Sequence, residues 1–293
     1  MQNDPTKPIW VSKKPQPLEL QQATKPIWVN KTPQPLKLEQ AKKPYRIFVA
    51  TPVHSEVSLH YTQALLEFQT YCHFKGIEVM FQLVKSSLVT QGRNLCVDYF
   101  MTAGHTHLLF IDSDIDFNAK DIQTMVELDK DVISIPYPLK TMNWEKAFND
   151  VKSGKVKDAK GLSLATNLYP LKMDDENNIK IEPDGTIEVS HSPTGCMLIK
   201  RSVIEKMIAA WPDMKIEQDT VINGKMVKKE FFYNFFDTEF DAKNHTYLGE
   251  DFAFCKRWRS LGGKCHAYID ATIAHIGEHQ YIGKFGDELI RTS

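Results

Sequence analysis

From Pro44 onward, short runs of β-branched and aromatic residues alternate with longer amphipathic stretches, and this alternation constrains the fold more than any other feature. The strands that it predicts cover residues 45–51, 77–84, 107–111 and 132–135. The helices that it predicts between them cover residues 57–75, 93–103 and 121–128. Strands and helices that alternate at this spacing indicate an α/β fold, with a mostly parallel central sheet and helices on both faces.

The alternation is interrupted in the middle of the chain. Residues 149–188 are polar and turn-rich, which indicates an insertion that carries a hairpin around residues 183–185. Regular structure resumes with a strand expected at 195–200. A last helix is expected from Gly249 to the glycine pair at 262–263, because glycine commonly ends helices.

The first 44 residues differ in composition from the rest, since they hold eight of the fifteen prolines, eight lysines and only three acidic residues. Within them a unit repeats with a period of 18, so that TKPIWV at 6–11 returns at 24–29. Two copies of so short a unit do not build a solenoid. We expect residues 1–44 to be a tail attached to one domain at 45–293. The tail is either a duplicated leader or a pair of extended peptides that dock a tryptophan on this domain or on a partner protein.

Composition and charge argue against several function classes. A formal net charge of −1 gives no overall attraction to nucleic acid or anionic lipid. Five cysteines without a C-x-x-C pair predict reduced, buried thiols, not a disulfide framework or a zinc knuckle. The N-terminus lacks an apolar signal segment, and no apolar stretch approaches the ~20 residues that cross a bilayer. We expect a cytoplasmic protein without membrane contact.

Three alternating acidic residues, Asp112, Asp114 and Asp116, follow the strand expected at 107–111. Ligands of open α/β sheets bind beyond the carboxyl ends of strands, so these acids stand where a ligand is expected. Side chains two apart on an extended segment point the same way, which lets Asp112 and Asp114 address one site. Such a pair suits Mn²⁺ or Mg²⁺ with positions left open for diphosphate oxygens. Acids at a strand end also cap helices or line solvated turns, so the pattern alone does not decide.

Five short motifs in order give this acidic pair a context. They are Arg93-Asn94, Asp112-Ser113-Asp114, Pro193-Thr194-Gly195, Gly249-Glu250-Asp251 and Ala274-His275-Ile276-Gly277. Over residues 45–280 the ordered set resembles the GT-A glycosyltransferases, which have a Rossmann-like fold and include small stand-alone enzymes of bacteriophages and large viruses. The resemblance implies a metal-dependent enzyme that transfers a sugar from a nucleoside-diphosphate sugar, with UDP-sugar favoured, to a hydroxyl acceptor. If the protein is viral, the expected location is the host cytoplasm.

The resemblance also implies which residues contact the donor and the metal. The implied donor-binding residues are Thr51, Pro52, Val53, Arg93, Asn94, Asp112, Ser113 and Lys140. The implied metal ligands are Asp112, Asp114 and His275. In this assignment Arg93 and Asn94 open a helix, and His275 follows a strand-like run at 268–274. A lone histidine after a strand is often structural, although imidazole is a suitable nitrogen ligand for Mn²⁺. Asp116 and His279 are weaker candidates for the same site.

Two carboxylates that open the last helix are candidates for the catalytic base. Gly249-Glu250-Asp251 is similar to the segment on the acceptor side of the donor sugar, where a carboxylate is the general base of inverting enzymes. Asp251 is the first choice and Glu250 the second, because a base must reach the attacking hydroxyl. The other interpretation is that both acids only stabilise a helix N-terminus.

Two other functions fit parts of the pattern. A sugar nucleotidyltransferase also has an acidic metal site at a strand end, but it carries a glycine-rich loop after the first strand, where residues 52–56 read PVHSE. A non-catalytic binding module on the same fold would be expected to have lost a metal ligand, and all three are present.

The acceptor is left open. A glycan, a lipid-linked sugar, a protein side chain and a hydroxymethylated DNA base each offer a hydroxyl. For DNA, the segment from Lys256 to Arg259 would supply basic and aromatic side chains on one surface.

Overall fold

The computed structural model describes residues 45–222, 225–243 and 245–279. The tail at 1–44, with its repeat and its expected docking role, lies outside these residues. The strands are β1 (Arg46–Val53), β2 (Glu78–Lys85), β3 (His107–Ile111), β4 (Ile115–Asp116), β5 (Val132–Ser134), β6 (Thr186–Val189), β7 (Cys196–Lys200), β8 (Thr220–Ile222), β9 (Lys225–Val227), β10 (Glu239–Asp241), β11 (Thr246–Leu248), β12 (Cys265–Tyr268) and β13 (Ala274–His275). The helices are α1 (Leu59–Lys75), α2 (Val89–Ala103), α3 (Ala119–Glu127), α4 (Trp144–Lys152), α5 (Ala159–Ala165), α6 (Arg201–Ala210), α7 (Glu250–Ser260) and the short 3₁₀ helix η1 (Pro212–Met214).

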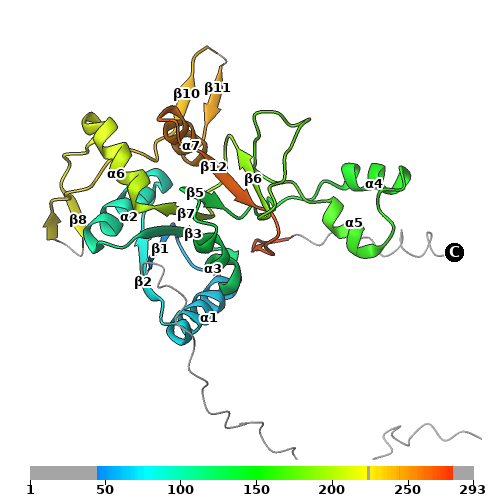
Figure 1. Cartoon of the computed structure of the whole chain (residues 1–293), viewed down its shortest axis with the longest axis horizontal. Helices are drawn as coiled ribbons and strands as arrows, with labels where there is room; N and C mark the ends of the chain where they lie inside the picture. Colours follow the sequence, from blue (N-terminus) through cyan, green and yellow to red (C-terminus); the bar gives the residue numbers. More distant parts are fainter. Residues whose placement is uncertain (1–44, 223–224, 244, 280–293) are drawn as a thin grey trace, which may run out of the picture. The chain divides into compact units, whose positions relative to one another are not determined.

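A seven-stranded mixed sheet forms the centre of the domain, in the order β2-β1-β3-β7-β5-β12-β6 (Figure 1). Strand β1 pairs in parallel with β2 and β3, and β5 pairs in parallel with β12. Strand β7 runs antiparallel to β3 and β5, and β6 runs antiparallel to β12. Five of the seven strands therefore share one direction, which confirms the α/β class. Their carboxyl ends meet at one edge of the sheet, where a ligand site is expected.

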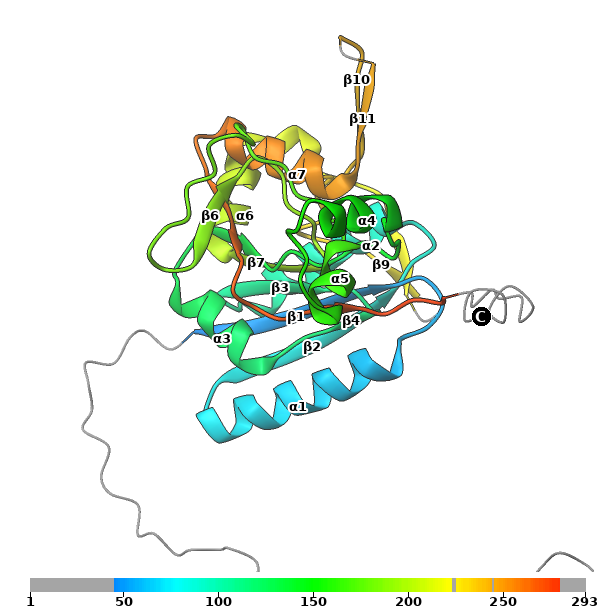
Figure 2. The same cartoon turned by 90° about the vertical axis from the view of Figure 1, so that its right-hand side faces the viewer.

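Helices cover both faces of the sheet (Figure 2). One core contains buried side chains of α1 and α3, and the other contains those of α2, α6 and α7. Successive residues of β1 alternate between them, because side chains of a strand point to opposite faces: Ile47 and Val49 join the first core, Phe48 and Ala50 the second. This burial on both faces explains why the strands read as continuous apolar runs.

Helix α1 shows how local sequence sets an element's limits. Its N-cap Ser58 accepts a hydrogen bond from the Tyr61 backbone N–H at 3.0 Å. It ends at Gly76, whose φ of 65° is the left-handed conformation that glycine adopts without strain. The helix expected at 57–75 is thereby confirmed to within two residues.

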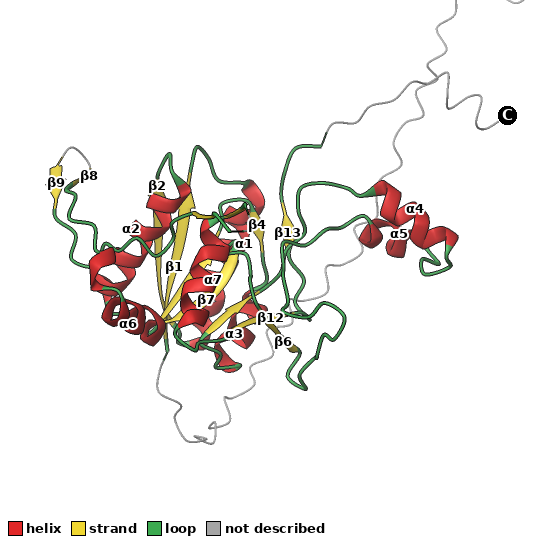
Figure 3. Ribbon diagram, turned by 90° about the horizontal axis from the view of Figure 1, so that it is seen from above, coloured by secondary structure: helices red, strands yellow, loops and turns green. Residues whose placement is uncertain are grey.

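The middle of the chain differs most from expectation. The turn at 183–185 is present, since Glu182 N–H donates to Thr186 O at 2.8 Å, but the two helices α4 and α5 were not expected. Figures 1 and 3 show this pair standing clear of the sheet and of the other helices. Residues 149–165 are rich in lysine and in small polar residues, which resembles a polar loop in composition.

Two further expectations need correction. The run at 268–274 is not one strand, because β12 ends at Tyr268 and only Ala274–His275 returns to strand geometry as β13. Helix α2 begins at Val89, four residues before the expected start. Glycine at 92 is unfavourable within a helix, so the sequence did not indicate this earlier start. The glycine lies in a tight place, since a Cβ would lie 3.2 Å from Ser86 Cβ and 3.3 Å from Pro52 Cβ.

Two compositional expectations can be compared with the structure. All five cysteines are buried and none forms a disulfide, as expected of reduced core thiols. None of the helices in the described part of the chain has the length and apolar character that a membrane span needs.

Candidate functional site

A cavity of about 400 Å³ opens at the carboxyl ends of β1, β2 and β3. It is lined by Pro52, Val53, His54, Ser86, Ser87, Val89, Arg93, Asp112, Ser113, Asp114, Tyr137 and His275. Seven of the sequence-predicted site residues are thus brought together, although they come from segments up to 223 positions apart: Pro52, Val53, Arg93, Asp112, Ser113, Asp114 and His275. Parallel strands produce this convergence, because their carboxyl ends lie at the same edge.

The turn that carries Asp112 and Asp114 is held by backbone hydrogen bonds from several sides. Asp112 N–H donates to Gly195 O at 3.0 Å, and Ser58 N–H donates to Ser113 O at 2.8 Å. Ile276 N–H donates to Asp114 O at 2.8 Å. The two carboxylates are therefore fixed relative to β7, to the start of α1 and to the segment that carries His275.

Arg93 joins two of the predicted acids. Its Nη2 lies 2.9 Å from Asp112 Oδ1 and 3.2 Å from Oδ2, and its Nε lies 3.1 Å from Glu250 Oε1. The guanidinium is only 3% exposed, and burial alone would lower its pKa, but the two carboxylates outweigh burial and raise it. Arg93 is therefore charged, and it links the acidic turn to the N-terminus of α7.

Asp114 has a separate set of partners. Lys140 Nζ lies 2.5 Å from Asp114 Oδ2, and His275 Nε2 lies 3.6 Å from Asp114 Oδ1. Burial would raise the pKa of Asp114, but the contacts with His275 and Lys140 hold it at about 2. The carboxylate is thus ionised, with one oxygen facing a lysine and the other an imidazole.

Asp251 has a pKa that is raised from the ordinary value of an aspartate toward neutral pH. Burial, followed by the charge of Glu250, raises the pKa of Asp251 to about 6. Its Oδ1 accepts a hydrogen bond from Phe252 N–H at 2.7 Å. A carboxylate with such a pKa is suited to accept a proton near neutral pH.

Tyr137 lines the cavity, whereas the sequence suggested only that the loop at 137–140 resembles one beside the donor sugar and assigned a contact to Lys140 alone. Its ring makes an edge contact with His275, with centroids 4.9 Å apart, and burial keeps its phenol neutral by raising its pKa. A Cβ at Gly195 would lie 2.4 Å from this ring, so glycine is required for Tyr137 to pack here. His54, Ser86 and Ser87 were also missed, although the ends of β1 and β2 could have suggested them.

Several predicted residues do not line the cavity. Thr51 is fully buried, and its hydroxyl lies 2.7 Å from the Tyr61 hydroxyl. Asn94 accepts from Phe236 N–H at 2.9 Å and donates to Asn234 Oδ1 at 3.0 Å, so it anchors the aromatic segment at 231–236. Asp116 and His279 are not among the lining residues either. The same holds for Lys140, Glu250 and Asp251, although Lys140 contacts Asp114 and Glu250 contacts Arg93.

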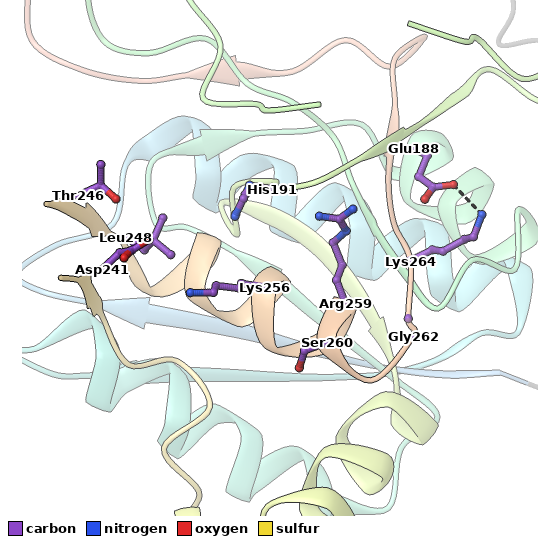
Figure 4. Close-up of a pocket in the computed structure, with 11 residues that line it drawn as sticks. Glu188, His191, Asp241, Thr246, Leu248, Lys256, Arg259, Ser260, Gly262 and Lys264 are labelled. Atoms are coloured by element: carbon purple, nitrogen blue, oxygen red, sulfur yellow. Dashed lines mark hydrogen bonds and ion pairs between the residues drawn. The ribbon is translucent and has the colours of Figure 1, made fainter. Parts of the chain in front are cut away.

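A larger cavity, of about 630 Å³, lies along α7 (Figure 4). Figure 4 shows Arg259 extending toward the side where His191 and Glu188 lie, and Lys256 extending toward the β10–β11 hairpin. The ring centroids of His191 and Phe252 lie 5.0 Å apart, and Phe252 follows Asp251 in the chain. Asp251 therefore opens the helix whose exposed side borders this second cavity.

Comparison with known proteins finds similarity only among solved structures, and two of these neighbours are described below. No known family and no curated protein matches the sequence. The chain is similar to A197 from STIV, with 17% identity over 80% of this chain and 86% of that chain, at a TM-score of 0.42. It is also similar to a glycosyltransferase involved in the glycosylation of the major capsid of PBCV-1, with 11% identity over 57% of this chain and 66% of that chain, at a TM-score of 0.30. Because both TM-scores are below 0.5, the inference of function rests on the site itself.

Proposed function

We propose that this chain is a metal-dependent glycosyltransferase that transfers a sugar from a nucleoside-diphosphate sugar, with a UDP-sugar favoured, to a hydroxyl acceptor. One observation carries the proposal: Asp112, Asp114 and His275 line one cavity, and Arg93 connects Asp112 to Glu250, the neighbour of Asp251 in the chain. Lys140 contacts Asp114 beside this cavity. The buried Arg93 thereby links the acidic turn at the proposed diphosphate site to the end of α7 that carries Asp251, the carboxylate of raised pKa.

The residues fit a divalent cation with two protein ligands. His275 Nδ1 lies 2.9 Å from Pro138 O, to which Nδ1–H can donate, and Nε2 lies 3.6 Å from Asp114 Oδ1. A cation that displaced the proton from Nε2 would be held between this nitrogen and the Asp114 carboxylate. Both oxygens of Asp112 face Arg93, and no group of three His, Cys, Asp or Glu side chains among the described residues is disposed as a metal site. Mg²⁺ and Mn²⁺ are often held by one or two side chains together with substrate phosphates, which suits Asp114 and His275.

The side chains around the cavity have separate roles in the proposed reaction. Pro52 and Val53 form an apolar wall for the nucleotide base. A bound divalent cation would neutralise the charge that develops on the departing diphosphate. Lys140 is close enough to Asp114 to move to a phosphate oxygen when a cation takes its place. Arg93 Nη1 is buried without a partner among the described residues, so a hydroxyl or phosphate oxygen of the donor would satisfy it.

Asp251 is the proposed general base. It would accept the proton of the acceptor hydroxyl as that oxygen attacks the anomeric carbon and the bond from that carbon to the diphosphate breaks. Glu250 holds Arg93 and keeps the pKa of Asp251 high, so it has a positioning role.

The cavity along α7 favours a glycan over DNA as the acceptor. Trp258 is 2% exposed, and its Nε1 donates to Lys264 O at 3.1 Å. Arg257 donates to the backbone oxygens of residues 235 and 237, and Lys256 and Arg259 pair with Glu239 and Asp174. The basic, aromatic surface expected for DNA is therefore used inside the fold or neutralised. Paired charges beside the aromatic ring of Phe252 suit the hydroxyls and apolar face of a sugar.

The proposal is tested by donor hydrolysis. The full chain is incubated with Mn²⁺ and a panel of UDP-, GDP-, CDP- and dTDP-sugars, and release of nucleotide is measured, since water replaces the acceptor in this assay. We expect slow hydrolysis of one donor class that stops when the metal is chelated. Neither hydrolysis nor a thermal shift with any donor would favour a binding module, and formation of a nucleotide-sugar from a nucleoside triphosphate and a sugar phosphate would favour a nucleotidyltransferase.

A further inference from the structure

Helix α4 presents an unusual apolar face to solvent. Trp144, Phe148 and Val151 are spaced four and three residues apart, which places them on one face of the helix. They are 59%, 58% and 45% exposed, whereas Ala147 is fully buried. Amphipathic helices of a folded domain normally bury this face, so the α4 apolar face (Trp144, Phe148 and Val151) is available to a partner.

The surroundings of this face carry positive charge. Residues 139–165 contain six lysines and three acidic residues, a net charge of +3 in a chain whose net charge is −1. Lys152 Nζ lies 4.3 Å from the centroid of the Phe148 ring. Lys152, Lys157 and Lys160 are exposed, and none of them pairs with a carboxylate in the described part of the chain. An apolar face with exposed lysines near it is complementary to a surface whose outer layer is anionic and whose inner layer is apolar.

We propose that the α4 apolar face and its lysines dock onto the surface of an anionic phospholipid bilayer. Trp and Phe on one face of a short helix, with lysines beside them, are typical of helices that lie in the interface of a membrane. The lysines would contact lipid phosphates while the three apolar side chains enter the boundary of the acyl chains.

Two observations favour a bilayer over other occupants. A second copy of this chain would bring two faces of net positive charge together, which is unfavourable. A cavity of about 490 Å³ also lies at the base of the α4–α5 pair, lined mainly by apolar residues that include Pro138, Leu164, Tyr169, Leu171, Met173 and Ile273. Such a cavity next to the helices has room for part of a lipid chain.

A short segment of chain links the docking surface to the donor site. Lys140, which contacts Asp114, is four residues before Trp144, and Leu139 N–H donates to Leu168 O at 2.8 Å at the base of the pair. This inference does not depend on the chemistry proposed for the cavity, and it replaces the expectation of no membrane contact that composition alone suggested.

The test is sedimentation of the full chain with vesicles of phosphatidylcholine alone, or with about a third of the lipid replaced by phosphatidylglycerol. We expect binding to the anionic vesicles that weakens with added salt. The double variant Trp144→Ser/Phe148→Ser should bind at least about tenfold more weakly, because it removes the largest apolar area. Phe74→Ser is the matched control, since Phe74 is an 82% exposed aromatic on α1.

Circular dichroism of each variant shows whether it folds as the wild type does. The lysine-rich residues 1–44 are the same in every protein, so any difference between variants belongs to α4. The proposal is overturned if the wild type stays in the supernatant with both vesicle types, or if the double variant sediments like the Phe74 control. A wild-type dimer in analytical ultracentrifugation that the double variant loses, without vesicle binding, would overturn it in favour of a second copy.

Discussion

Replacing Asp251 with Asn is expected to lower the rate of sugar transfer at least ~10²-fold and, in the same protein, to raise the free energy of unfolding near pH 8. The rate falls because an amide cannot accept the proton of the acceptor hydroxyl. Burial and Glu250 raise the pKa of Asp251 to about 6, so the ionised carboxylate destabilises the folded state above that pH. Stability rises because the amide of Asn carries no charge. A shift from 3.8 to about 6 corresponds to roughly 1 to 3 kcal/mol.

The pH dependence follows from the sign of this shift. A carboxyl whose pKa is raised by folding destabilises the fold above that pKa and has no effect below its unfolded value of 3.8. The stability advantage of Asp251→Asn should therefore shrink between about pH 6 and pH 4. For the wild type, kcat/KM should rise with pH through about 6 as the base loses its proton. Urea unfolding and rate measurements across this range check both statements.

Glu250→Gln is the matched control for this experiment. It removes the same charge from the neighbouring position, but it also weakens the contact with the buried Arg93. We expect it to retain more activity than Asp251→Asn and to be less stable than the wild type. An active Asp251→Asn beside an inactive Glu250→Gln would move the role of base to Glu250.

Asp114→Asn is expected to remove the stimulation of donor hydrolysis by Mn²⁺, with a loss of at least ~10²-fold in kcat/KM. The amide keeps the shape of the side chain but loses the charge that faces His275 and Lys140. Because Asp114 is 34% exposed, the free energy of unfolding should change by no more than about 1 kcal/mol. Hydrolysis is measured over a range of Mn²⁺ concentrations, and stability by thermal unfolding.

Asp116→Asn makes the same substitution two residues away, at a position that does not line the cavity. It should leave Mn²⁺-dependent hydrolysis unchanged. Equal losses of Mn²⁺-dependent hydrolysis in both variants would show that the turn responds to any change of charge. Such a result would contradict the proposal that Asp114 is a metal ligand.

Five strands of the central sheet, β1, β2, β3, β5 and β7, could be predicted because their sequences report burial directly, whereas β6 and β12 were not predicted. The run at 107–111 is apolar at consecutive positions, and it coincides with β3, which is covered on both faces. Helices α4 and α5 could not be predicted in the same way. Their partners are each other and the loop beside them, so they are not marked by burial in the central core. Trp144, Phe148 and Val151 do have helical spacing, but the face that they form is exposed.

The candidate site was predictable where side chains follow strands. Asp112 and Asp114 come directly after β3, and the topology brings His275 to them through the pairing of β13 with β4. Thr51 and Asn94 sit beside cavity residues in sequence, yet they point into the core, because neighbours on a strand or helix face different sides. The role of Tyr137 depends on its packing against Gly195, a contact between distant segments that no local pattern encodes.

Calorimetric titration of UDP into the full chain, with Mn²⁺ and then with a chelator, tests the central claim most directly. If a cation held by Asp114 and His275 binds the diphosphate, UDP should bind at least about tenfold more tightly with Mn²⁺, a difference of about 1.4 kcal/mol. Asp114→Asn should abolish that difference. Equal affinity with and without the metal, or no binding of UDP under either condition, would contradict the account.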